Sequence, residues 1–116
     1  MAFRFEDLHV WKKALELDSR INLLTKTFPN DELFVLTAQI KRATDSVVLN
    51  IAEGSTGQTK KVFKVFLSYA LRSAIEVVSC LFIARERGFI DSRNFKELYN
   101  DYEELVKMLT ALRKSF

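Results

Sequence analysis

The stretch NIAEGSTGQTKK, from Asn50 to Lys61, is the part of this 116-residue chain that most resembles a chemical site. It holds two of the three glycines, one acid and a pair of lysines. A Walker A loop requires the pattern G-x-x-x-x-G-K-[ST], because the glycines let the backbone wrap a phosphate and the lysine neutralises it. Here Gly54 and Gly57 are three residues apart, and Gln58 follows the second glycine. This spacing argues against a nucleotide site.

No other residues have the spacing of a catalytic or metal site. A di-iron bundle needs inward-facing Glu-x-x-His pairs, and His9 is the only histidine in the chain. Cys80 has no histidine near it in the sequence and lies on an apolar segment, so we expect a packed thiol rather than a nucleophile. We therefore predict a protein that is not an enzyme and that has no metal and no cofactor.

Length and composition predict one domain over residues 1–116, because the 48% hydrophobic content supplies material for a single core. The longest apolar run, VVSCLFIA at residues 77–84, is far shorter than the roughly 20 residues of a membrane span. The N-terminal sequence MAFRFEDLHVW has acids where a secretory signal has an apolar run, and a single cysteine cannot form an internal disulfide. We expect a cytoplasmic protein with no membrane contact.

One proline, few glycines and apolar residues at three- and four-residue intervals predict an all-α protein. A first helix ends before Pro29, a second covers residues 31–53, a third covers 60–87, and a fourth starts after Asp91. The second is expected to bury Leu33. Short connections make successive helices antiparallel neighbours, which gives an up-down-up-down four-helix bundle.

The predicted helix ends rest on residues with capping preferences. Thr59 and Asp91 are the expected N-caps of the third and fourth helices, and Gly88 is the expected left-handed residue after the third. Gly54 ends the second helix, and a positive φ there would explain why the residue is glycine.

The third helix is apolar over about 200° of its circumference, twice the stripe of roughly 100° that faces one bundle core. Val65 and Ile75 lie beyond this arc. We expect the surplus to form a second buried face against another subunit. The alternative is a central helix that wraps its neighbours within one chain.

Positive charge gathers between residues 41 and 72, where six bases against Asp45 and Glu53 give a local charge of +4. Lysines at the start of the third helix lie beside free backbone N–H groups, a combination that suits an anion. A nucleic-acid backbone is the functional interpretation, and a solvated face is the structural one. The predicted nucleic-acid-binding residues are Arg42, Lys60, Lys61, Lys64 and Arg72.

Glu53 is expected at the negative end of the second helix, where a carboxylate is unfavourable by about 0.3–1 kcal/mol. The loop N–H groups and the two lysines that follow can offset this energy. We therefore favour a structural loop clamp formed by Asn50, Glu53 and Gly54 over a ligand site.

Three segments resemble a known family: FEDLHVWKKA at residues 5–14, LTAQIKRATDSVVLNIAEG at 36–54 and TKKVFKVFLSYA at 59–70. They look like the four-helix-bundle proteins encoded in 23S rRNA intervening sequences. That family is similar to the accessory variability protein of diversity-generating retroelements, a homopentamer that binds nucleic acid and a reverse transcriptase. The resemblance implies a homopentamer and contact with RNA, DNA or a nucleic-acid-handling protein.

The chain departs from the family pattern at several positions. Residues 55–58, STGQ, replace a turn that usually carries an arginine, and Arg72 replaces a usual glycine. Val48 stands where the family has a proline, and Val62 where it has an acid. These changes leave the predicted fold intact but remove a basic contact. The rival hypothesis is a protein-interaction scaffold without nucleic-acid contact.

Overall fold

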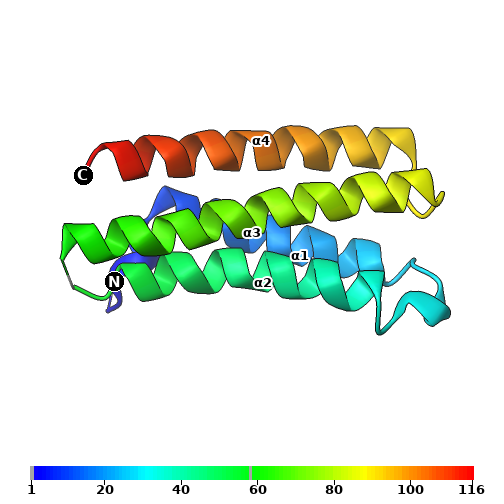
Figure 1. Cartoon of the computed structure of the whole chain (residues 1–116), viewed down its shortest axis with the longest axis horizontal. Coiled ribbons are helices and arrows are strands. Elements are labelled where there is room, and N and C mark those ends of the chain that lie inside the picture. Colours follow the sequence, from blue (N-terminus) through cyan, green and yellow to red (C-terminus); the bar gives the residue numbers. More distant parts are fainter. Residues whose placement is uncertain (1, 58) are drawn as a thin grey trace.

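The structure, a computed structural model, describes residues 2–57 and 59–116. Its four α-helices lie side by side along the long axis and alternate in direction (Figure 1), with no strand in the described ranges. Neighbouring pairs are α1 with α2, α2 with α3, α3 with α4, and α4 with α1. The predicted all-α, antiparallel four-helix bundle is confirmed. The helices are α1 (His9–Thr25), α2 (Leu36–Gly54), α3 (Lys60–Glu86) and α4 (Ser92–Lys114), with short 3-10 helices η1 (Arg4–Asp7) and η2 (Asn30–Glu32).

The core consists of one apolar stripe from each helix. Leu17, Ile40, Leu67 and Leu105 come from the four helices in turn, and each is fully buried. Other buried residues precede and follow each of them at three- and four-residue spacing, so one side of every helix faces the bundle axis. Burying each such side chain contributes about 1.5–3 kcal/mol, so these stripes hold the bundle together.

In the described part of the chain, one buried side-chain hydrogen bond crosses this core. The hydroxyls of Thr44 on α2 and Tyr102 on α4 are 2.7 Å apart, and Tyr102 is 1% exposed. Tyr102 can be completely buried because Thr44 supplies a partner hydroxyl on α2. Burial also raises the pKa of Tyr102, so the phenol stays protonated.

The caps of the third and fourth helices are confirmed. The Thr59 hydroxyl accepts a hydrogen bond from the Val62 amide at 3.2 Å, and the Asp91 carboxylate accepts one from the Asn94 amide at 2.7 Å. Gly88 has a φ of +77°, the left-handed conformation predicted for it.

The start of α2 differs from the prediction. The helix begins at Leu36 rather than at residue 31, because the Glu32 carboxylate accepts a hydrogen bond from the Leu36 amide at 3.4 Å and the chain turns between them. The turn leaves Leu33 52% exposed, so its predicted burial is wrong. Phe34 is even more exposed, at 89%.

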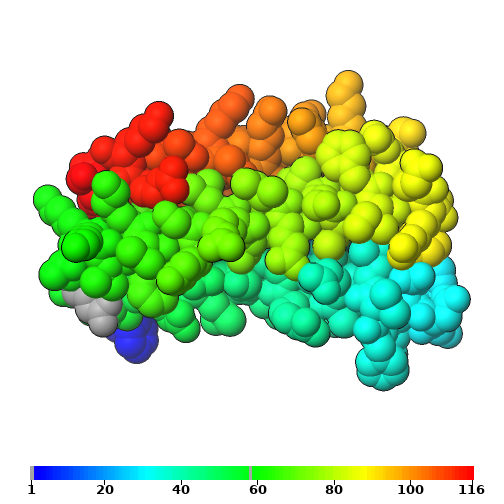
Figure 2. All heavy atoms as spheres, viewed as in Figure 1, coloured from blue at the N-terminus to red at the C-terminus, as the bar shows by residue number. Residues whose placement is uncertain are grey.

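Helix α3 is the central element of the face seen in Figure 2, where it runs between α2 and α4. By length and composition it is the one described helix that could cross a membrane. This is weak evidence for a span, since nine of its side chains are buried in the bundle and a core helix has the same composition.

Candidate nucleic-acid interface

The five predicted nucleic-acid-binding residues are all exposed, and none forms an ion pair with another residue of the described ranges. Lys60, Lys61 and Lys64 lie in the first turns of α3. Arg72 lies eight residues after Lys64, or about 12 Å further along the helix axis. The chain therefore presents three lysines together at one end of the bundle.

Helix α4 brings two further bases to this end. Arg113 donates a hydrogen bond to the Ser68 hydroxyl at 3.1 Å, and Ser68 donates to the Lys64 carbonyl at 3.1 Å. Arg113 and Lys114 lie in the last turn of α4. The start of α3 and the end of α4 meet at the same end of the bundle (Figure 1), so they form one surface. We call this surface the basic end and define it as Lys60, Lys61, Lys64, Arg113 and Lys114.

Aromatic contacts hold the two helices together at the basic end. The ring of Phe63, which is 2% exposed, lies 5.0 Å from the ring of Phe116, centroid to centroid. The Arg4 guanidinium lies 5.4 Å from the centre of the Phe63 ring, within the range of a cation–π contact. Sequence reasoning missed the bases of α4, although the predicted antiparallel order of the helices was a sufficient signal for them.

Arg42 and Arg72 lie near the middle of the bundle, away from the basic end. Arg72 borders a hollow of about 590 Å³ between α2 and α3. The Ser73 hydroxyl on α3 donates to the Ser46 hydroxyl on α2 at 2.9 Å, and Arg42 is one turn before Ser46. The five predicted bases thus form two groups in a single chain, three lysines at one end and two arginines further along.

The predicted role of Gly54 needs a correction. It belongs to α2, and the described residues with positive φ are Gly57 and Gly88. A Cβ added at Gly54 would lie 2.7 Å from the Phe66 Cβ and 2.9 Å from the Phe63 Cδ1. Glycine is required there because α3 packs against it.

The other two members of the predicted clamp do not contact the loop. Asn50 donates to the Ser46 carbonyl at 2.8 Å and to the Ser46 hydroxyl at 3.0 Å, both within α2. Glu53 is exposed and forms no hydrogen bond or ion pair with the residues described. Gln58 of the same loop lies outside the described residues. The role of Glu53 stays a prediction, and helix packing at Gly54 fixes this end of α2.

The acidic segment of α4, residues 99–104, has its charges paired within the chain. Asp101 pairs with Arg20, and the Lys13 Nζ lies 3.8 Å from Asp101 and 3.5 Å from Glu104. Lys13 and Arg20 of α1 supply the cations of these pairs. The negative charges of α4 therefore tie α1 to α4.

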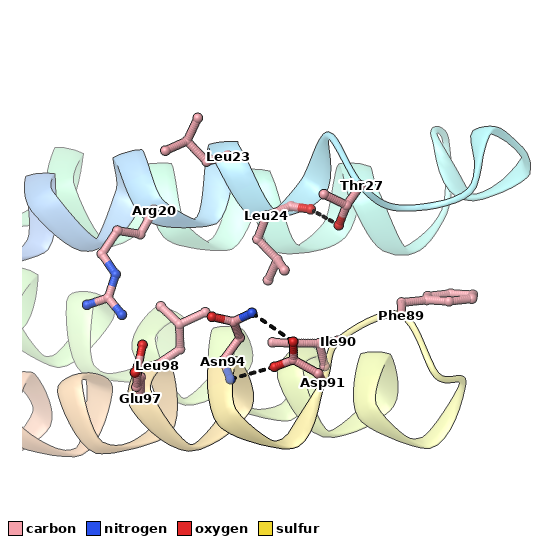
Figure 3. A pocket seen from close by; sticks show the side chains of 10 residues that line it. All are labelled: Arg20, Leu23, Leu24, Thr27, Phe89, Ile90, Asp91, Asn94, Glu97 and Leu98. Atoms are coloured by element: carbon pink, nitrogen blue, oxygen red, sulfur yellow. Dashed lines mark hydrogen bonds between the residues drawn. The ribbon is translucent and has the colours of Figure 1, made fainter.

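A groove of about 460 Å³ lies between α1 and α4 (Figure 3). Leu24 and Leu98 point into it, and Asp91 pairs with Asn94 at its edge. Asp91 accepts two hydrogen bonds from Asn94, at 2.7 and 3.1 Å, while Arg20 pairs with Asp101 outside the groove lining. Among the described residues that line the groove, no nucleophile is paired with a base.

Cys80 is 3% exposed, which confirms a packed thiol. Burial, with a smaller effect of Glu76, raises the pKa of Cys80 to about 11, so the reactive thiolate is scarce at neutral pH. Within the described ranges, no group of three His, Cys, Asp or Glu side chains could hold a metal ion.

Together these features define a small all-α protein of the four-helix-bundle class, with exposed cations at one end of the bundle. Residues 6–111 match the family model of the 23S rRNA-intervening sequence protein, and the chain belongs to this family. It is similar to a crystal structure of a protein of unknown function from the S23 ribosomal protein family of Bacteroides thetaiotaomicron. The TM-score is 0.84 at 31% identity, over 90% of this chain and 95% of that chain. No curated protein matches the chain.

Proposed function

We propose that this protein is a non-enzymatic, cytoplasmic helical bundle that self-associates and contacts RNA, DNA or a nucleic-acid-handling protein through its basic end. The observation that carries the proposal is the gathering of Lys60, Lys61 and Lys64 beside Arg113 with no ion-pair partner in the described part of the chain. A pentamer is the preferred assembly, on the strength of the family resemblance.

The electrostatics of the basic end favour an anionic partner. The three lysines lie at the N-terminus of α3, where the positive end of the helix dipole repels them. Their position therefore does not stabilise the helix, which favours a role in binding. Exposed cations without neutralising acids create a positive potential that attracts phosphates. Contacts to a phosphate backbone would give little sequence preference, because base edges are not read.

The outer surface of α3 supports self-association. Five large apolar side chains of this helix are at least 39% exposed, although one bundle core needs only one stripe. They are Val65, Tyr69, Ile75, Phe82 and Ile83. Gathered apolar exposure of this kind marks a surface that a partner covers. In a closed assembly the basic end is repeated, so weak contacts to one strand add up.

Fluorescence anisotropy with mixed-sequence RNA and DNA at low and moderate salt tests the nucleic-acid part. We expect affinity to fall steeply with salt, because each neutralised phosphate releases about 0.7–0.9 of a condensed counterion. Changing Lys60, Lys61 and Lys64 to Gln should weaken binding for all sequences and flatten the salt dependence. The matched control changes Arg93 and Lys96 to Gln, because both are exposed and lie on the first turns of α4 at the other end.

The second candidate is an interaction scaffold without nucleic-acid contact, and the exposed apolar side chains of α3 favour it. Absence of binding at low salt, in a protein that still self-associates, would support the scaffold and refute the nucleic-acid proposal. Binding that the lysine changes leave intact would refute the basic end as its site.

A further inference from the structure

A hollow of about 260 Å³ lies between α1 and α2 and combines an apolar rim with two acids. We call it the acidic hollow; it is lined by Leu15, Asp18, Asp45, Val48 and Leu49. Leu15 is 42% exposed and Leu49 is 58% exposed, so the apolar rim is open to a partner.

The two carboxyl groups of the acidic hollow lie within hydrogen-bond reach of each other, and the charge of Lys41 also acts on Asp18. Asp18 hydrogen-bonds to Asp45, and neither forms an ion pair with the residues described. Burial, followed by the hydrogen bond and charge of Asp45, raises the pKa of Asp18 to about 7, while Lys41 opposes the shift. Two carboxylates in contact repel each other when both are ionised, so the hollow favours a group that brings positive charge.

The outer face of α3 has the opposite character. Arg72 is exposed and has no ion pair or hydrogen bond within the described ranges. Tyr69 precedes it by three residues and Ile75 follows by three, and Val65 lies one turn before Tyr69. These three apolar side chains are 43–60% exposed, so exposed Arg72 has apolar neighbours along the helix, while Ser73 and Glu76 lie beside it at the hollow toward α2. We call Val65, Tyr69, Arg72 and Ile75 the α3 outer face.

The two surfaces cannot meet within one chain. Helices α1 and α3 are diagonal in the bundle, and each packs on α2 and α4 instead. A guanidinium has five N–H donors and can bridge two carboxylates, and both surfaces carry exposed apolar side chains next to their charged groups. Two different complementary surfaces on one chain produce a head-to-tail contact between copies.

We propose that the acidic hollow of one copy receives Arg72 of a second copy of this chain. Val65, Tyr69 and Ile75 of the second copy then pack against Leu15 and Leu49 of the first. This inference rests on the self-association in the proposed function and goes beyond it, because it assigns the two surfaces that meet and their direction.

Charge reversal tests the pairing, with mass measured by light scattering coupled to size exclusion in the absence of nucleic acid. Arg72→Glu or Asp45→Arg should each weaken association more than tenfold, because like charges then face each other. At micromolar concentration the mass should fall toward the 13.5 kDa of one chain. Both residues are exposed, so circular dichroism should show an intact bundle.

Combining the two changes restores opposite charges across the contact, so the double variant should regain the wild-type mass. Arg93→Glu is the control, since Arg93 is exposed and pairs with Glu97 of its own helix, at 3.4 Å. A monomeric wild-type protein would overturn both this inference and the proposed self-association. An oligomer unaffected by either single change, or dissociated variants that the double change does not restore, would overturn the Arg72 pairing alone.

Discussion

Replacing Gly54 with alanine tests how tightly α2 and α3 pack at their connection. The added Cβ would lie 2.7 Å from the Phe66 Cβ and 2.9 Å from the Phe63 Cδ1, well inside van der Waals contact. Rotation of a side chain cannot move the Phe66 Cβ, so the two helix backbones must separate. Overpacking of this kind is unfavourable by about 1–3 kcal/mol.

Helix propensity acts in the opposite direction. Alanine stabilises the interior of a helix by about 1 kcal/mol relative to glycine. The gain is smaller at Gly54 because this residue is the last of α2. The net expectation for Gly54→Ala is a loss of about 1–2 kcal/mol in the free energy of unfolding. At roughly 4 °C per kcal/mol, this lowers Tm by about 4–8 °C. Valine, with two further methyl groups, should lose more.

Urea unfolding followed by circular dichroism measures the change, and Phe63→Leu supplies the matched background. Removing the Phe63 ring relieves one of the two close contacts, so the penalty of Gly54→Ala should shrink in that background but not vanish. A Gly54→Ala protein that is as stable as the wild type would refute the packing explanation, since helix propensity would then outweigh the contact.

Three further predictions follow from single contacts. The pKa of Asp18 is about 7 in the folded protein against 3.8 for a free carboxyl. The folded state therefore holds this proton more tightly, and the resulting contribution to stability is complete below pH 3.8 and is lost as pH rises through 7. Urea unfolding of Asp18→Asn should therefore show a stability gain over wild type that grows from pH 5 to pH 8. Asp91→Ala removes the N-cap of α4 and should lower the free energy of unfolding by about 1 kcal/mol, measured in the same way. Cys80 should react with iodoacetamide much more slowly in the native protein than in denaturant; equal rates would contradict its burial.

The antiparallel bundle and the features set within one helix could be predicted from the sequence, whereas side-chain contacts between helices could not. Thr59 and Asp91 cap helices through amides three residues away, so local residue types were sufficient. The start of α2 instead depends on Glu32, whose carboxylate also pairs with Arg87 beyond the end of α3 at 3.4 Å. Residue types alone favoured a helix start at residue 31. The contact between Glu32 and Arg87 joins residues far apart in the sequence, so the local sequence does not show it.

The candidate site shows the same division. The exposure of the predicted bases followed from their place on helix surfaces, and the distance of Arg72 from the lysines followed from its position along α3. The place of Arg42 relative to them depended on how α2 lies against α3. Asp18 and Asp45 are 27 residues apart and meet only through the relative rotation of α1 and α2. Gly54 was identified as structural, yet its reason is the approach of Phe66 rather than its own φ.

The hydrogen bond between Thr44 and Tyr102 couples the position of α4 along its axis to that of α2. It joins residues 58 positions apart on two helices that are not neighbours, so it forms only when α1 or α3 packs on both and holds them at the right separation. A hairpin of α2 and α3 alone leaves the Thr44 hydroxyl on an apolar surface without its partner. A buried hydroxyl without a partner is unfavourable by about 1–3 kcal/mol, so a compact intermediate with α4 shifted along its axis is penalised. The contact thereby restricts α4 to one position along its axis. Folding is then more cooperative than apolar contacts alone would make it.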